Sequence, residues 1–246
     1  MRSGVRAIVQ SPSQRSGATV VIGASWVVLV AAGEGTRLGG DVRKAALQLH
    51  GRSLASISLA AAMAHSSCRG AVLVVHPDDL ARASGWVRES TVEPSVQVVA
   101  GGRQRRDSVL AGLDALEADP ADLVVIHDGA RPALHERDLQ RVLEAGAGSG
   151  AAALATPVID TLHQLDEHGH WSQRVDRTRL WQAQTPQIFR LGLLREVLRA
   201  ASGLQTDEVE AVASTGQEVQ FVEAQHPNPK ITTAADVRSI EALLDG

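Results

Sequence analysis

The chain has 246 residues, of which 44% are hydrophobic, and a formal net charge of −4 at pH 7, so it is long enough for one α/β domain with a globular core. The slight acidity, the lack of a basic run and an aromatic content of 2% argue against a nucleic-acid-binding protein. A single cysteine excludes an intrachain disulfide and a cysteine-cluster metal site, and it fits a reducing cytoplasm.

Residues 1–25 differ in composition from the rest of the chain. They contain three arginines and no acidic residue, and they include the apolar stretch Ala18–Ile22. We expect a disordered leader, or an over-extended start site, ahead of a single domain over residues 26–246. The alternative is a signal peptide with Ala18–Ala32 as its apolar region, but its cleavage would remove the first strand.

Strands and helices alternate over the first two thirds of this domain. Short apolar runs predict strands at Val27–Ala32, Ala71–Val75, Val96–Val99, Leu123–His127 and Ala151–Thr156. Helices are expected between them at Ser53–Ser66, Leu80–Glu89, Val109–Leu116 and Glu136–Ala145. This order predicts a doubly wound, mostly parallel sheet with right-handed crossovers, in which ligands bind at the carboxyl ends of the strands.

The alternation breaks after Pro157. Thr161–Leu165 and Trp171–Val175 flank a polar turn, which predicts a β-hairpin arm at about residues 158–177 that projects from the domain. Because an isolated hairpin is marginal in water, we expect its apolar residues to pack against a second copy of the chain in a two-fold dimer. The alternative is an arm folded back on its own domain.

The last part of the chain returns to helices and one strand. Helices are expected near Leu191–Ala201, after Asp207 and over Ala234–Leu244, with Thr233 as the cap of the last one. A strand is expected near Val219–Glu223.

A glycine-rich loop follows the first strand. It contains Gly33, Gly35, Gly39 and Gly40, whose amides can approach a ligand because no Cβ is in the way. With the cations Arg37 and Lys44, the loop predicts a polyphosphate cradle, and the alternative is an ordinary glycine-rich turn. It lacks the Gly-Lys-Ser/Thr of a Walker A loop and has Leu38 where a dinucleotide fingerprint needs its third glycine.

Two further strand ends carry residues suited to ligands. Gly101-Gly102 and Ser108 follow the third strand, where the backbone could contact a base or form a plain turn. Asp128 follows the fourth strand and precedes Arg131. It can hold a magnesium ion that is mostly coordinated by phosphates, and the alternative is a turn or N-cap aspartate.

No catalytic nucleophile with a partner base is evident in the sequence, and Arg177, Thr185 and Lys230 are the further polar candidates. An attacking phosphate would itself be largely ionised at pH 7, since its second pKa is about 6. Such a reaction needs positioning and charge neutralisation rather than a general base.

Seven short motifs occur in one order along residues 26–244. They are Ala31-Ala32-Gly33-x-Gly35-x-Arg37, Gly101-Gly102-x-x-Arg105-x-x-Ser108-Val109, His127-Asp128-x-Ala130-Arg131-Pro132, Ala155-Thr156-Pro157-Val158-x-Asp160-Thr161, Arg177-x-x-Leu180-Trp181-x-Ala183-Gln184-Thr185-Pro186-Gln187, Thr206-Asp207 and Asn228-x-Lys230-Ile231-Thr232. Together they resemble the 2-C-methyl-D-erythritol 4-phosphate cytidylyltransferase family of non-mevalonate isoprenoid biosynthesis.

The resemblance implies a Rossmann-like nucleotidyltransferase fold in a cytoplasmic, Mg²⁺-dependent enzyme. Methylerythritol phosphate would attack the α-phosphorus of CTP, giving 4-diphosphocytidyl-2-C-methyl-D-erythritol and pyrophosphate. By matching position, Arg37 and Lys44 would stabilise the α-phosphate in the transition state. The CTP-binding set would be Ala31, Ala32, Gly33, Gly35, Gly101, Gly102, Ser108, Asp128 and Ala130, with Asp128 facing the magnesium-bound triphosphate.

The resemblance also implies a second substrate site. Methylerythritol phosphate would be held by Arg131, Thr161, Arg177, Thr185, Thr206 and Lys230, of which Arg177 and Lys230 belong to the catalytic set as well. The family's dimer exchanges its arms, so Arg177 would serve the partner's site.

The sequence departs from the family's usual pattern at a few positions. Val30 and Arg43 stand where proline is usual, Ala45 where glutamine is usual and Gly129 where alanine is usual. The loss of proline at Arg43 is expected to loosen the segment that presents Lys44.

Two other functions compete with this interpretation. A cytidylyltransferase for another polyol phosphate, such as ribitol 5-phosphate, would share the CTP half of the site. A non-catalytic nucleotide-binding regulator would not need to keep the cations of a transition state, and the presence of Arg37, Lys44, Asp128 and Lys230 argues against it.

Overall fold

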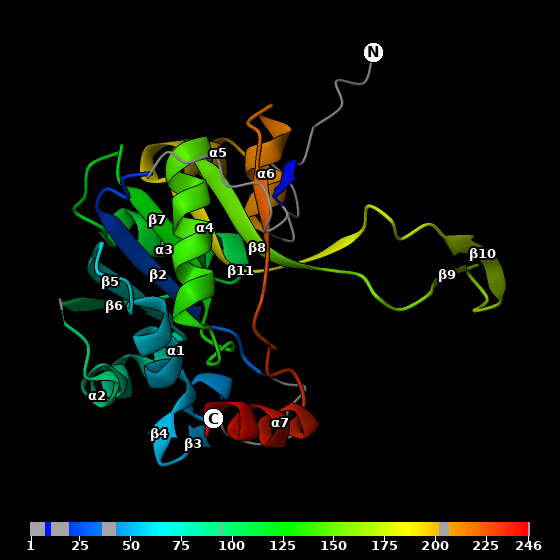
Figure 1. Cartoon of the computed structure of the whole chain (residues 1–246). Coiled ribbons are helices and arrows are strands. Elements are labelled where there is room, and N and C mark those ends of the chain that lie inside the picture. The colour runs from blue at the N-terminus through cyan, green and yellow to red at the C-terminus, as the bar shows by residue number, and fades with distance from the viewer. Residues whose placement is uncertain (1–7, 11–19, 36–42, 94, 202–206, 246) are drawn as a thin grey trace.

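The computed structural model describes residues 8–10, 20–35, 43–93, 95–201 and 207–245. Its centre is one sheet with the strand order β1-β12-β8-β11-β7-β2-β5-β6 (Figure 1). These strands are β1 (Ile8–Gln10), β12 (Gln220–Glu223), β8 (Ala151–Pro157), β11 (Trp181–Arg190), β7 (Leu123–Asp128), β2 (Ser25–Ala31), β5 (Cys68–Val75) and β6 (Val96–Ala100). Among the described residues of this sheet, all pairings are parallel except those of β11 with β7 and β8, so the predicted mostly parallel sheet is confirmed.

Helices cover both faces of this sheet (Figure 1). Side chains alternate between the two faces along a strand, and in β2 Val27 and Leu29 join one core while Val28 joins the other. The first core contains residues of α1 (Leu54–Ala62), α2 (Leu80–Ser90) and α4 (Glu136–Ser149). The second contains residues of α3 (Arg105–Ala115), α5 (Leu191–Ala200) and α6 (Glu208–Ser214).

Polar caps fix where several helices begin. The hydroxyl of Ser53 accepts from the amide of Ser56 at the start of α1, which ends at Ala62, earlier than the sequence predicts. Thr233 precedes α7 (Ala234–Leu244) as predicted, and its amide and hydroxyl both donate to Asp236. Helix α7 packs against a short hairpin of β3 (Gln48–Leu49) and β4 (Arg52–Ser53).

Strand β11 was not expected from the sequence, because Pro186 lies in its middle and proline cannot donate to a sheet ladder. The pairing of β11 with β8 shifts register between Ala183 and Gln187. Pro186 falls inside this irregularity, so its missing N–H interrupts no regular pair. The strand therefore tolerates a residue that normally argues against one.

The expected leader contains one described element. Residues Ile8–Gln10 form β1, which pairs in parallel with β12 at the edge of the sheet. The expectation of a disordered leader is therefore wrong for these three residues. The physical reason is that β12, at the edge of the sheet, offers unpaired backbone groups to a neighbouring segment. Residues 1–7 and 11–19 lie outside the described residues.

The predicted arm is present as a two-stranded antiparallel hairpin of β9 (Leu162–Leu165) and β10 (Trp171–Val175). It extends well away from the sheet, joined to β8 by residues 158–161 and to β11 by residues 176–180 (Figure 1). Ile159, Leu165 and Trp171 on this arm are exposed large apolar side chains. In the part of the chain that the structure describes, no helix has the length and apolar character to cross a bilayer.

Candidate active site

A cavity of about 410 Å³ lies at the carboxyl ends of β2 and β7, next to the start of α3. Its size suits a small-molecule ligand. Ten of the residues singled out in the sequence line it, namely Ala31, Ala32, Gly33, Gly35, Lys44, Gly102, Ser108, Asp128, Ala130 and Lys230. The expected convergence of strand ends on one crevice is thus confirmed for these residues.

Gly101 and Gly102, beside the cavity, have no room for a Cβ. A Cβ on Gly101 would lie 2.4 Å from the Cβ of Ala32, and one on Gly102 would lie 2.3 Å from the Cβ of Asp107. The hydroxyl of Ser108 accepts a hydrogen bond from the amide of Gly102 at 3.1 Å. By contrast, a Cβ on Gly33 would meet no atom within 4 Å, so this glycine leaves open space in the cavity wall.

Asp128, the last residue of β7, lies close to three cationic side chains of the site. Its Oδ1 lies 2.5 Å from Arg105 Nη1, and its Oδ2 lies 2.7 Å from Lys230 Nζ and 3.8 Å from Arg131 Nε. Its amide donates to the hydroxyl of Thr185 at 3.0 Å. Burial raises the pKa of Asp128, but the attraction of Arg105 and Lys230 outweighs it, so the pKa lies below its usual value.

Arg105 links Asp128 to a second acid. Its Nη2 lies 3.0 Å from Oε2 of Glu208, whose side chain is buried at the start of α6. Burial raises the pKa of Glu208, and the guanidinium of Arg105 opposes this shift. With Arg131 and Lys230, three cations meet two carboxylates, and the cluster keeps a formal surplus of one positive charge.

The segment that carries Lys230 is tied across the strand ends. Asp138 accepts from the amides of Gln225 and His226, and the side chain of Asn228 donates to the carbonyl of Thr185 at 2.8 Å. The ammonium of Lys44 donates to the carbonyl of Ile231 at 2.8 Å. The two lysines therefore reach the cavity from the glycine-loop side and from this segment.

His127 is adjacent to Asp128 but is not placed as a base. It is fully buried, and burial lowers its pKa to about 4, so it is neutral at pH 7. Its Nε2 donates to the carbonyl of Arg131 at 3.0 Å. His127 is therefore a buried packing residue.

The comparisons with known proteins identify the family. The model of IspD, 2-C-methyl-D-erythritol 4-phosphate cytidylyltransferase, matches residues 25–246. The chain belongs to this cytidylyltransferase family. The enzyme of that name from Ectopseudomonas mendocina (strain ymp) is 43% identical over 220 residues, which cover 86% of this chain and 92% of the relative.

Two further relatives of the family agree over nearly the whole length. The 2-C-methyl-D-erythritol 4-phosphate cytidylyltransferase of Stenotrophomonas maltophilia (strain R551-3) is 43% identical, over 90% of this chain and 97% of the relative. The crystal structure of the enzyme from Thermus thermophilus superposes with a TM-score of 0.71 at 32% identity, covering 89% of this chain and 98% of that one. The fold and the family therefore rest on sequence and structure together.

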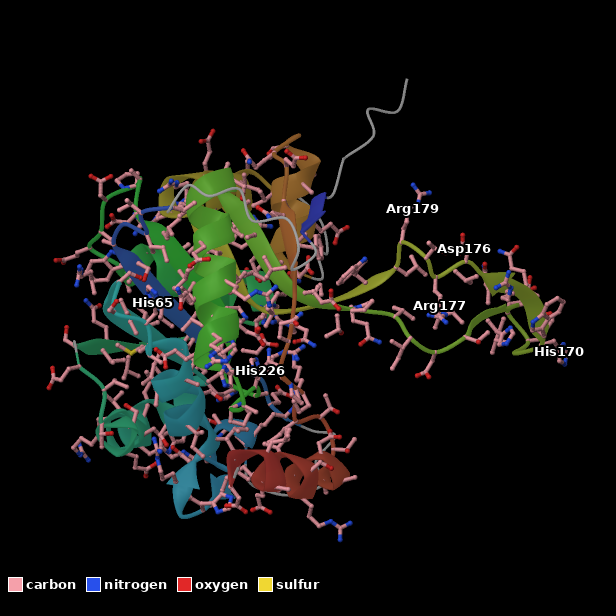
Figure 2. All side chains as sticks on the ribbon, viewed as in Figure 1. His65, His170, Asp176, Arg177, Arg179 and His226 are labelled. Atoms are coloured by element: carbon pink, nitrogen blue, oxygen red, sulfur yellow. The ribbon has the colours of Figure 1, made fainter. Side chains whose placement is uncertain are left out.

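Not all of the predicted site residues of this cytidylyltransferase-family chain meet at the cavity. Gly101, Arg131 and Thr185 pack directly behind its lining through the contacts given above. Thr161 and Arg177 belong to the arm instead, and Figure 2 shows Arg177 on the projecting part, away from the sheet. The guanidinium of Arg177 donates there to the carbonyl of Val158 at 3.0 Å. Arg37 and Thr206 lie outside the described residues.

Arg105 and Glu208 were not predicted as site residues. Both stand inside the quoted motifs or directly after them, but 103 positions separate them in the sequence. The available signal was the position of Arg105 in the first turn of the helix that follows the Gly101-Gly102 turn, one of the strand ends already expected to bind ligand. The sequence spacing alone could not show that Glu208 is the acidic partner of Arg105.

The side chains that line the cavity suit a metal ion bound mainly by substrate phosphates better than one bound mainly by the protein. Within the described ranges, no group of three or more His, Cys, Asp or Glu side chains could hold a metal ion. Glu34 and Asp128 are the acidic residues among those that line the cavity. Mg²⁺ characteristically keeps waters and binds one or two carboxylates plus substrate phosphates, so this lining suits it.

Proposed function

We propose that the protein transfers CMP from CTP to 2-C-methyl-D-erythritol 4-phosphate, in the non-mevalonate route to isoprenoids. The observation that carries this proposal is the cavity in which Gly33, Gly35, Lys44, Asp128 and Lys230 converge. Family membership supplies the substrates, since the matching family and its relatives carry this activity in their names. The products would be 4-diphosphocytidyl-2-C-methyl-D-erythritol and pyrophosphate.

The proposed chemistry needs cations rather than a base. A phosphate oxygen of methylerythritol phosphate attacks the α-phosphorus of CTP, a new P–O bond forms, and the bond to the β-phosphate oxygen breaks to release pyrophosphate. Lys44 and Arg37 neutralise the charge that builds on the α-phosphate. Lys230, held by Asp128 at the cavity, keeps the phosphates of the two substrates together.

Recognition of cytosine is assigned to the tight turn beside α3. The backbone of Gly101 and Gly102, with Ala31, Ala32 and Ser108, would surround the base in a space that has no room for added side chains. The polyol phosphate would be held by Arg131, Thr185, Thr206 and Lys230.

A magnesium ion is part of the proposal as a group held mainly by the triphosphate. Asp128 would be its protein ligand, and Glu34 lines the same cavity. The ion would supply charge neutralisation on the phosphates. Both carboxylate oxygens of Asp128 already face cations, so Asp128 would bind the ion alongside Arg105 and Lys230.

We further propose that the protein is a homodimer and, as its family resemblance implies, a cytoplasmic enzyme. Thr161 and Arg177 sit on the arm, outside the cavity of their own chain, so we propose that they complete the site of a partner subunit. The exposed Leu165 and Trp171 give the arm apolar surface to bury against that partner.

An assay of pyrophosphate release tests the function and its rivals. CTP is combined with methylerythritol phosphate, with ribitol 5-phosphate, or with no acceptor, in the presence of Mg²⁺. Of these three mixtures, only the one that contains methylerythritol phosphate should release pyrophosphate rapidly. Faster release with ribitol phosphate would assign the enzyme to another polyol phosphate, and CTP binding without release in any mixture would indicate a regulator.

A further inference from the structure

Arg43 connects the chain just before Lys44 to the exit of the neighbouring strand β5. Its Nη1 lies 3.2 Å from Oδ1 of Asp79, and its Nη2 contacts the carboxylate of Asp78. We propose that Arg43 is a positioning residue whose guanidinium clamps the Lys44 segment and so sets where the Lys44 ammonium meets the substrate. This inference rests on the proposed function.

The anchor of the clamp is fixed in the fold. Asp79 is fully buried, and it ends η3 (Pro77–Asp79), directly before α2. Its amide donates to the carbonyl of His76 at 2.8 Å, so its backbone is held independently of the half-exposed Arg82 side chain, whose Nε donates to its Oδ1 at 2.8 Å. Charge-assisted bonds to a buried carboxylate of fixed position are stronger and more directional than pairs in free solvent. The ion pairs of Arg43 therefore attach it to a rigid part of the molecule.

The backbone of Arg43 restrains Lys44 in turn. Arg43 is the N-cap of η2 (Lys44–Ala46), and its carbonyl accepts from the amide of Ala46 at 3.0 Å. Lys44 is thus the first residue of a tight turn closed on Arg43. A lysine side chain is flexible, so the position of its backbone decides how its ammonium reaches the cavity and the carbonyl of Ile231.

The proposed clamp would offset the loosening expected from the loss of proline at Arg43. Arg43 has φ −63° and ψ 146°, which is the φ that a proline ring imposes. Its amide makes none of the hydrogen bonds found among the described residues. A proline at this position would restrict the backbone directly, whereas arginine restrains it through the side-chain clamp.

The test compares Arg43→Ala with Arg82→Ala, a matched control that loses a contact to the same Asp79 but does not adjoin Lys44. Pyrophosphate release is measured at saturating substrates, and thermal unfolding shows that each variant is folded. Because a displacement of about 1 Å can cost roughly 10²-fold in rate, we expect kcat to fall about 10- to 100-fold in Arg43→Ala, with KM for CTP much less affected. Arg82→Ala should stay close to wild type, and Arg43→Pro should recover most of the lost kcat.

A double-mutant cycle with Lys44→Ala decides whether Arg43 acts through the lysine. If it does, Arg43→Ala costs little or nothing more in the Lys44→Ala background. An equal loss in both backgrounds, or a wild-type kcat in Arg43→Ala, would overturn the proposal.

Hydrogen exchange separates this inference from the proposed function. The amides of residues 44–47 should exchange faster in Arg43→Ala than in Arg82→Ala, whether or not any substrate turns over. If wild type releases no pyrophosphate, the proposed function fails while exchange still reports on the clamp. Unchanged exchange in Arg43→Ala would refute the clamp on its own.

Discussion

At the scale of single residues, Asp128 determines how charge is arranged in the site. It faces Arg105, Arg131 and Lys230, and Glu208 holds Arg105 from the other side. Without a bound anion, the carboxylate keeps these cations close together at the cavity wall. An incoming phosphate finds them already in place, which lowers the cost of organising them during the reaction.

Lys44 is the lysine expected to act mainly in the transition state. We predict that Lys44→Ala lowers kcat by roughly 10²–10³, because one preorganised electrostatic partner of the α-phosphate is lost. Binding of CTP, measured by calorimetry, should change much less, and Lys44→Arg, which keeps the charge, should lose less activity. A collapse of CTP affinity with kcat unchanged would contradict this role.

His127 is expected to make the stability depend on pH. Its pKa is about 4 in the folded protein and about 6.5 when unfolded, so between these values the unfolded chain binds more protons. The free energy of unfolding should therefore rise with pH across this window, by about 3 kcal/mol from this residue. Urea titrations at several pH values should show a smaller rise in His127→Gln, which can keep a donor near the carbonyl of Arg131.

The control for this prediction is His168→Gln on the exposed turn of the arm. That variant should keep the wild-type pH dependence. The same dependence in His127→Gln as in wild type would show that the buried imidazole is not its source.

At the scale of elements, the sequence predicts those strands and helices that a local residue pattern determines. The buried parallel strands are apolar runs, and the hairpin has a polar turn between short segments, so both could be predicted. Strand β11 could not be predicted, because a proline in its middle argues against a strand, and β1 could not, because it pairs with β12, which is distant in the sequence. The bond between Arg105 and Glu208 likewise depends on a tertiary contact that no local pattern records.

The glycines of the site should separate into two classes when each is replaced by alanine. Gly101→Ala places a methyl group against Ala32, so we expect a loss of about 1–3 kcal/mol in the free energy of unfolding. Gly33→Ala meets open space, so it should keep its stability but raise KM for CTP by occupying the cavity wall. Thermal unfolding and initial rates measure both effects.

Gly148 in α4 gives the matched control, since a Cβ there also meets nothing within 4 Å and it does not line the cavity. Gly148→Ala should leave KM unchanged. An unaltered KM in Gly33→Ala would mean that CTP does not approach this part of the loop.

At the scale of the whole molecule, the arm is the feature that a single chain does not explain. It stands clear of the sheet, with Arg177 on its projecting part (Figures 1 and 2). Its exposed apolar side chains and its distance from the cavity in the same chain favour a site built by two subunits. Its hairpin was predictable from the sequence, but its direction depends on how β8 and β11 leave the sheet.

A mixing experiment tests this arrangement. Arg177→Ala and Lys44→Ala should each be nearly inactive alone. If Arg177 acts in the partner's site, each mixed dimer has one intact site, and random exchange restores roughly a quarter of the wild-type sites. No recovery, with subunit exchange confirmed by mass spectrometry, would place Arg177 in its own chain's site or outside the site altogether.

The most direct test of the whole account follows the oxygen atoms of the reaction. Methylerythritol phosphate labelled with ¹⁸O in its phosphate group is incubated with CTP, Mg²⁺ and the enzyme, and the products are analysed by ³¹P NMR and mass spectrometry. Attack of that phosphate on the α-phosphorus predicts that all of the label stays in the cytidine diphosphate product and that pyrophosphate is unlabelled. Label in pyrophosphate, release of CMP, or no cytidine diphosphate product would contradict the proposed transfer.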